Sequence, residues 1–276
     1  PPPAPLLGDR PMTTLVEARG LTVRFPSRGG VGVVALDGVD LDVAEGETLG
    51  VVGESGSGKS TLGRVILGLQ HSDAGVVSYR GRPVGGPKAS QVELRRRAQI
   101  VFQDPQSSLN PRLSVARTLG EVLRVIGCPG ERVQEEVLRL LDQVGLPPDV
   151  ATALPHALSG GQRQRVGIAR ALAVKPEFIV LDEPVSALDV SVQARILNLL
   201  LDLQERLGLA YLFISHDLAV VRRMSDRILV LREGRVVEAG PTPEIVSRPS
   251  HPSTRTLIAA ALPVLGPRSR SPLADP

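Results

Sequence analysis

One glycine-rich segment carries a lysine and several hydroxyl groups at a spacing suited to phosphate binding. Its residues are Gly53, Glu54, Ser55, Gly56, Ser57, Gly58, Lys59, Ser60 and Thr61. Glycines let backbone N–H groups turn toward phosphate oxygens, and the start of a following helix adds a favourable dipole. We expect Lys59 to reach the β- and γ-phosphates of a nucleoside triphosphate and the Ser60 hydroxyl to ligate Mg²⁺. A flexible turn is the alternative, but the flanking apolar run and helix start favour a phosphate-binding loop, or P-loop.

A pair of adjacent carboxylates is the second group of residues suited to chemistry. Asp182 and Glu183 follow the apolar run 178–181, at the end of a predicted strand. Open α/β sheets place their ligand sites at this end of the strands. We expect Asp182 to hold the Mg²⁺ shell and Glu183 to polarise the attacking water as a general base. The alternative is a pair of carboxylates that merely face solvent.

A second helix start with anion-binding character lies a hundred residues after the P-loop lysine. Ser159 is placed as an N-cap, Gly160 and Gly161 expose backbone N–H groups, and a basic helix follows. An ordinary capped helix explains the same residues without a ligand. The sequence therefore offers two separate cradles for phosphate groups.

The elements that must position these residues follow from the hydrophobic pattern. Continuous apolar runs at 49–52, 178–181 and 211–214 predict strands buried on both faces of a parallel sheet. Short β-rich runs within 15–43 predict antiparallel strands, and helical spacing within 115–145 predicts a helical insert. We predict an α/β fold: a P-loop NTPase core with a parallel sheet, an N-terminal antiparallel β subdomain and an inserted helical subdomain.

The segment Leu158-Ser159-Gly160-Gly161-Gln162 matches the LSGGQ signature of one family. With the P-loop and the carboxylates in the family's order, the chain resembles the ATP-binding subunit of an ABC transporter over roughly Leu15 to Pro263. The resemblance implies ATP and Mg²⁺ as ligands and ATP hydrolysis coupled to transport. It also implies one ABC ATPase domain at 12–265, with a helical subdomain at about 104–172 inserted in the RecA-like core.

The resemblance assigns roles to further residues. Gln103 matches the Q-loop glutamine, which touches Mg²⁺ and the attacking water and connects to the membrane partner. His216 matches the switch histidine that contacts the γ-phosphate, although a lone histidine after a strand is more often structural. Residues 186–189 match the D-loop, and Phe25 is the best candidate to stack on adenine.

The family also implies partners and a location. Two ATPase subunits face head to tail, so that Ser159 and Gly161 of one subunit complete the P-loop site of the other. The second subunit can be identical or different, and separate membrane-spanning permease subunits and an extracytoplasmic binding protein complete the system. We expect this chain to lie at the cytoplasmic face of the plasma or inner membrane, as a peripheral subunit.

Three segments resemble the branch that imports dipeptides and oligopeptides. They are residues 102–112, residues 154–157 and residues 250–255, where Ser253 stands in place of the tyrosine usual in the branch. Nickel and glutathione importers belong to the same group and remain alternatives. An ATPase of DNA repair would need a coiled coil or zinc modules between P-loop and signature, and a translation ATPase would need two cassettes in one chain.

The composition of the chain limits the kinds of partner and metal site that can be expected. A net charge of +3, from 32 basic and 29 acidic residues, gives no reason to expect a nucleic-acid partner. Cys128 is the single cysteine, which excludes a disulfide or a thiolate metal cluster within the chain.

Both ends of the chain have the composition of tails. Proline-rich residues 1–11 predict a linker or disordered tail, which raises the hypothesis that the chain is the back half of a longer polypeptide. Residues 266–276 predict a second disordered tail.

Overall fold

Two β-sheets form the framework of the molecule. The computed structural model describes residues 13–27, 30–84, 94, 96–103 and 109–261, and the predicted tails lie outside these residues. The first sheet is antiparallel and four-stranded within the described chain, in the order β2-β1-β4-β5. Its strands are β1 (Thr14–Ser27), β2 (Gly30–Ala44), β4 (Ala74–Tyr79) and β5 (Arg82–Pro83).

The antiparallel sheet has longer strands than the sequence pattern predicted. The short β-rich runs expected within 15–43 merge into two long strands, and residues 30–44 form the single strand β2, whose pairing with β1 shifts register at several points. Gly38 takes a φ of 69° within β2, a conformation that glycine adopts without strain. Bulges of this kind bend a strand without ending it, so turn-like residues do not mark its limits.

The second sheet has the order β10-β9-β3-β8-β7-β6 and carries the predicted parallel strands. Its strands are β3 (Thr48–Val52), β6 (Ala98–Val101), β7 (Phe178–Asp182), β8 (Ala210–Ile214), β9 (Arg227–Arg232) and β10 (Arg235–Pro241). Neighbouring strands are parallel except for β10, which pairs antiparallel with β9. Every residue of β3, β7 and β8 is buried, as expected for strands covered on both faces.

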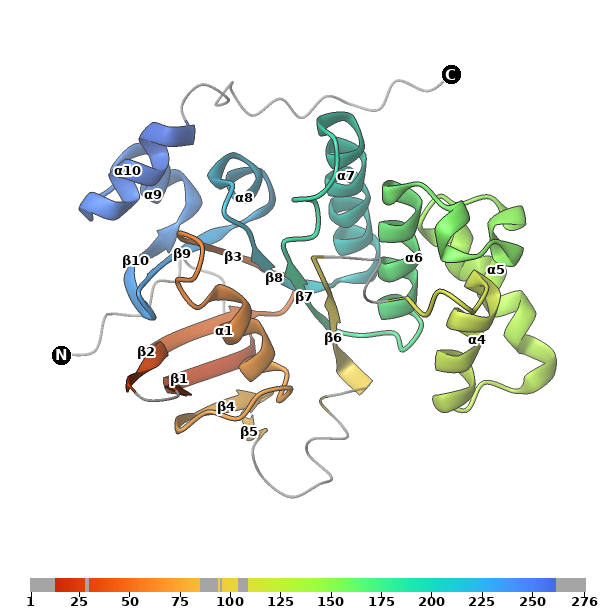
Figure 1. Cartoon of the computed structure of the whole chain (residues 1–276), viewed down its shortest axis with the longest axis horizontal. Coiled ribbons are helices and arrows are strands. Elements are labelled where there is room, and N and C mark those ends of the chain that lie inside the picture. The colour runs from red at the N-terminus through yellow and green to blue at the C-terminus, as the bar shows by residue number, and fades with distance from the viewer. Residues whose placement is uncertain (1–12, 28–29, 85–93, 95, 104–108, 262–276) are drawn as a thin grey trace.

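Helices cover this sheet and form the insert between β6 and β7. The helices are α1 (Lys59–Ile66), α4 (Val115–Val125), α5 (Val133–Gln143), α6 (Gly160–Leu172), α7 (Val190–Leu207), α8 (Leu218–Met224), α9 (Thr242–Ser247) and α10 (Pro252–Ala261), with 3₁₀ turns at Gly130–Arg132, Pro148–Thr152 and Pro155–Ala157. In Figure 1, α4, α5 and α6 lie together at the far side of the molecule from the antiparallel sheet. The predicted fold class is confirmed, whereas the bounds given to the domains stay a prediction.

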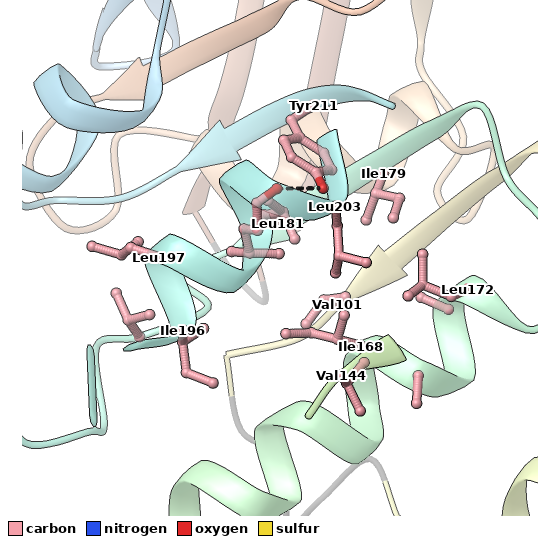
Figure 2. Packing of buried hydrophobic residues seen from close by; sticks show 14 of the residues in the cluster. Val101, Val144, Ile168, Leu172, Ile179, Leu181, Ile196, Leu197, Leu203 and Tyr211 are labelled. Carbon is pink, nitrogen blue, oxygen red and sulfur yellow. Dashed lines mark hydrogen bonds between the residues drawn. The ribbon is translucent and has the colours of Figure 1, made fainter. Parts of the chain in front are cut away.

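A buried apolar cluster joins the helical insert to the parallel sheet. Figure 2 shows Val144 and Ile168 of the insert facing Val101 and Ile179 of the sheet, with Tyr211 at the far end of the cluster. The Tyr211 hydroxyl donates a hydrogen bond of 3.0 Å to the Leu200 carbonyl of α7, so its polar end is satisfied within the core. α6 therefore packs against the strands that carry the predicted site through one continuous buried cluster.

None of the helices in the described part of the chain combines the length and apolar character needed to cross a bilayer.

Candidate functional site

The P-loop connects the end of β3 to the start of α1. Gly56 and Gly58 take φ values of 79° and 104°, which L side chains rarely adopt. A Cβ atom on Gly53 would lie 2.1 Å from the Leu231 carbonyl oxygen, and one on Gly58 would lie 2.2 Å from the Ala35 carbonyl oxygen. Backbone packing therefore requires glycine at 53 and 58, and the left-handed backbone is a second reason for glycine at 58.

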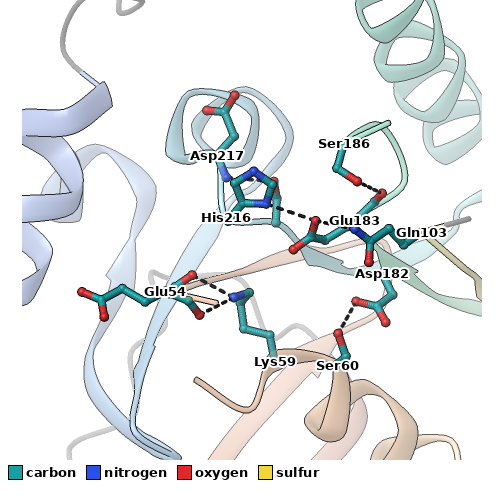
Figure 3. A network of polar contacts seen from close by, with 11 residues as sticks. Glu54, Lys59, Ser60, Gln103, Asp182, Glu183, Ser186, His216 and Asp217 are labelled. Carbon is teal, nitrogen blue, oxygen red and sulfur yellow. Dashed lines mark hydrogen bonds and ion pairs between the residues drawn. The ribbon is translucent and has the colours of Figure 1, made fainter. Parts of the chain in front are cut away.

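Lys59 opens α1 and is buried inside the loop. Its Nζ donates hydrogen bonds of 2.8 Å to the carbonyl oxygens of Gly53 and Glu54 (Figure 3). Burial lowers the pKa of Lys59, and the nearby carboxylates of Glu183 and Asp182 act in the opposite direction. Phosphate oxygens are stronger acceptors than carbonyls because they are charged, so the ammonium group is suited to bind them.

Ser60 and Asp182 meet across the site although 122 residues separate them. The Ser60 hydroxyl donates a hydrogen bond of 2.8 Å to Oδ1 of Asp182. Burial raises the pKa of the Asp182 carboxyl, while the hydrogen bond from Ser60 lowers it. A buried carboxylate beside a hydroxyl oxygen is a suitable hard-oxygen pair for Mg²⁺, which is commonly held by one or two protein ligands together with substrate phosphates. The described residues contain no cluster of three or more acidic, histidine or cysteine side chains placed to hold a metal ion.

Glu183 lies at the centre of a second group of contacts. Its Oε2 accepts a hydrogen bond of 3.2 Å from Nε2 of Gln103 and lies 3.1 Å from Nδ1 of His216. The Glu183 side chain is 15% exposed, so water can reach a carboxylate that is otherwise enclosed. Figure 3 shows these three side chains converging from different segments beside Lys59 and Ser60. The fold thus brings the predicted base, Q-loop glutamine and switch histidine together.

The backbone of Glu183 has an unusual conformation. Its φ is 48°, and its N–H donates a hydrogen bond of 2.9 Å to the Ile214 carbonyl at the end of β8. A left-handed conformation at a non-glycine residue costs about 1–3 kcal/mol and persists only where the surroundings impose it. The Ser186 hydroxyl also donates to the Glu183 carbonyl at 3.2 Å, which ties the predicted D-loop to this residue.

The signature segment begins α6 with a reciprocal cap. The Ser159 hydroxyl accepts a hydrogen bond of 3.2 Å from the Gln162 N–H, and the Gln162 side chain accepts one of 2.9 Å from the Ser159 N–H. Within the described residues, no hydrogen bond connects Ser159, Gly160 or Gly161 to the P-loop. The two cradles predicted from the sequence are therefore not joined by such bonds inside one chain.

Gly161 also has a packing role that the sequence did not indicate. A Cβ atom on Gly161 would lie 2.5 Å from Cγ1 of Val192, in the first turn of α7. Gly160 faces the predicted D-loop less tightly, since a Cβ atom there would lie 3.2 Å from Cδ2 of Leu188. Nothing in the residue types around Val192 signals this contact, because it depends on how α6 and α7 pack.

Phe25 lies on β1, and the residue is 44% exposed. This exposure leaves the ring accessible to a planar ligand, and its contact with adenine stays a prediction.

Asp217 has a role that the sequence analysis missed. Its side chain caps α8 by accepting a hydrogen bond from the Ala219 N–H at 2.8 Å. An aspartate directly before an apolar helical run is a recognisable N-cap signal.

Comparison with known proteins gives a consistent result. A family model described as "ABC transporter" matches residues 36–186. The chain is 48% identical over 262 residues to a protein of Brucella ovis named for peptide import and ATP binding, covering 94% of this chain and 82% of that one. It is also 48% identical over 266 residues to the glutathione import ATP-binding protein GsiA of Salmonella paratyphi A, covering 94% of this chain and 42% of GsiA.

Two solved structures have the same fold as this chain. The chain superposes on cbiO1 of Clostridium perfringens, described as part of the ABC transporter complex cbiONQ, with a TM-score of 0.76 and 28% identity over 86% of this chain and 92% of that one. It superposes on the ATP-binding cassette MJ0796, a dimer bound to ADP and Pi, with a TM-score of 0.73 and 31% identity over 83% of this chain and 99% of that one.

Proposed function

This chain belongs to the ABC transporter ATPase family, and on that premise we propose that it hydrolyses ATP to power an importer of peptides or related small solutes. One observation carries the proposal most directly. Gln103 and His216 both contact the carboxylate of Glu183, beside the Ser60–Asp182 pair and the buried Lys59 (Figure 3). A P-loop alone binds a triphosphate, but a positioned carboxylate next to it adds the means to hydrolyse it.

Each residue of the site has a separate role in ATP binding or hydrolysis. Lys59 binds the β- and γ-phosphates, and the P-loop N–H groups fix their orientation. Ser60, Asp182 and Gln103 would hold Mg²⁺, which would neutralise charge on the phosphates. Glu183 orients the attacking water and accepts its proton, while His216 lies against the same carboxylate and donates toward the γ-phosphate. Phe25 stacks on adenine.

The complete site is built from two subunits. Ser159 is exposed and caps the start of α6, followed by Gly160 and Gly161, and no hydrogen bond of the described chain connects these three residues to the P-loop. Facing a second ATPase subunit, they close over its γ-phosphate, exclude water and add hydrogen-bond donors there. The dimeric form of MJ0796 supports this arrangement.

The proposed partners follow from the names of the relatives. Proteins named for peptide import and for glutathione import match the chain at the same 48% identity, so peptides and small peptide-like solutes are the substrate class. The chain works at the cytoplasmic face of the membrane, bound to permease subunits that an extracytoplasmic binding protein supplies with substrate. A nickel importer of the same group is the second candidate within this function.

The test of the composite site uses the Glu183→Gln variant. This variant keeps the shape of the site and retains ATP, so light scattering should show a dimer with ATP and Mg²⁺ and a monomer without them. A Glu183→Gln, Ser159→Arg double variant is the matched control, because the bulky cation at the signature should prevent closure. A strict monomer with saturating ATP would count against the shared site.

The transport function needs a separate measurement. Stimulation of ATPase activity should appear when the chain is reconstituted with its permease, the binding protein and a peptide mixture. Glutathione and nickel are tested in parallel arms and identify the branch. Stimulation by DNA or ribosomes, with none by any permease, would contradict the importer assignment.

A further inference from the structure

The C-terminal segment Ser250–Ala261 contains polar residues to which the proposed ATPase function gives no role. Glu238 of β10 binds this segment through three hydrogen bonds. Its Oε1 accepts from the Ser250 N–H at 2.8 Å and from the Ser250 hydroxyl at 2.7 Å, and its Oε2 accepts from the His251 N–H at 3.1 Å. Burial acts to raise the pKa of Glu238, but hydrogen bonding from Ser250 and His251, together with the neighbouring Thr254 hydroxyl, lowers it to about 2. Glu238 therefore binds as a carboxylate and holds the start of α10.

One further contact from β9 and two made by Arg255 fix the conformation of the same segment. Arg232, at the end of β9, donates to the Ser253 hydroxyl at 2.6 Å. Arg255 donates to the carbonyl oxygens of Pro249 at 3.1 Å and Ser250 at 3.2 Å. Ser253 thus has a structural partner although the importer branch has tyrosine at this place. We call the residues Ser250–Ala261, held in this way, the C-terminal brace.

The brace packs against α8. Figure 1 shows α10 beside α8, above the strands β9 and β10. Ile258 of α10 is buried in the same apolar cluster as Val220, Val221 and Met224 of α8. On β3, a Cβ atom on Gly50 would lie 2.3 Å from Cγ1 of Val221, so α8 also rests directly on the sheet backbone. Helix α8 has only seven residues, too few to hold its place without such tertiary packing.

Helix α8 in turn sets the position of His216. Its N-cap is Asp217, the residue after His216, and the Asp217 N–H donates to the Ser215 hydroxyl at 3.0 Å. The His216 side chain is 58% exposed, and its contact with Glu183 is 3.1 Å. Because little packs around the ring, its place depends on the backbone at 215–218 and hence on α8.

We propose that the C-terminal brace positions the switch histidine, with Glu238 as the positioning residue that acts on His216 through α10 and α8. The expected effect on turnover rests on the proposed ATPase function. The expected effect on the position of His216 rests on packing alone. A shift of about 1 Å in a catalytic group lowers rates by as much as about 10²-fold, so loosening the brace is sufficient to affect turnover.

The kinetic test is a double-mutant cycle between Glu238→Ala and His216→Ala. We expect Glu238→Ala to lower kcat by roughly 10-fold with an unchanged KM for ATP, because nucleotide contacts lie elsewhere. In the His216→Ala background, measured under single-turnover conditions, the same change should have no further effect. Glu238→Gln keeps one acceptor oxygen and should restore part of the rate. Thr256→Ala is the control, since this exposed hydroxyl on α10 bonds only within its helix, to the Pro252 carbonyl.

The structural test does not depend on catalysis. In hydrogen exchange of the whole protein, Glu238→Ala should speed exchange at 215–224 and leave the P-loop and β7 unchanged. Ser250→Ala, which removes a single hydroxyl donor, replaces Glu238→Ala in both tests if that variant does not fold. An equal kcat loss with and without His216, or unchanged exchange at 215–224, would overturn the proposal. An inactive wild-type protein would contradict the ATPase function alone, because the exchange measurement would still decide the role of the brace.

Discussion

Replacing Gly161 by alanine should disable the signature segment through a contact inside the same chain. The added Cβ atom would lie 2.5 Å from Cγ1 of Val192, whereas carbon atoms pack best at about 3.5–4.0 Å. Val192 is β-branched and lies in the first turn of α7, so its side chain has little freedom to move aside. The start of α6 must therefore shift by about 1 Å, at a cost of about 1–3 kcal/mol in stability. We expect ATPase activity to fall by about 10²-fold, measured as phosphate release at saturating ATP.

A suppressor variant separates this explanation from a direct block of the partner's nucleotide. Val192→Ala removes the clashing methyl group, so Gly161→Ala with Val192→Ala should recover most of the activity and stability. Gly167→Ala is the matched control on the same helix, since a Cβ atom there meets nothing within 4 Å. This control should be neutral or more stable by up to about 1 kcal/mol. If the double variant stays as inactive as Gly161→Ala alone, the reasoning from Val192 is wrong.

Three further predictions concern the elements around the site. Gly50→Ala should destabilise the protein by about 1–3 kcal/mol in urea unfolding, because its Cβ atom would meet Val221 at 2.3 Å; unchanged stability would contradict that packing. Arg227→Met should cost about 3–5 kcal/mol, since it leaves the buried Glu47 carboxylate without the guanidinium now 3.1 Å away, and a loss below 1 kcal/mol would refute this. Glu238 has a pKa of about 2 against an ordinary 4.5, so its stabilising effect is complete above pH 4.5 and lost as pH falls toward 2. The difference in Tm between wild type and Glu238→Gln should thus be constant above pH 5 and shrink only below 4.5.

Local sequence patterns were sufficient to predict the framework of the site. The P-loop lies between β3 and α1, and Asp182 ends the buried strand β7, because strand burial and loop glycines leave direct marks in the sequence. The N-cap predicted at Ser159 is likewise a short-range pattern, and the structure adds Gln162 as its partner in a capping box. These features depend on neighbouring residues alone.

The remaining features depend on tertiary packing and left no local mark. The left-handed backbone of Glu183 is accompanied by a hydrogen bond from its N–H to the Ile214 carbonyl, 31 residues later in the chain. The approach of Gly161 to Val192 depends on how two helices pack, and the long bulged strand β2 was mistaken for separate short strands. A local sequence pattern cannot predict such contacts, because the contacting atoms come from segments far apart in the sequence.

The central claim is that Glu183 is the base of an ATPase site. It is tested most directly by comparing Glu183→Gln with wild type in a phosphate-release assay, with ATP binding measured on the same samples. The substitution preserves size and backbone conformation and removes only the ability to accept a proton. Glu205→Gln, at an exposed position on α7, is the control for the change of charge and should match wild type. We predict that Glu183→Gln binds ATP normally and hydrolyses it about 10²–10⁴-fold more slowly. Near-normal turnover in this variant would contradict the account.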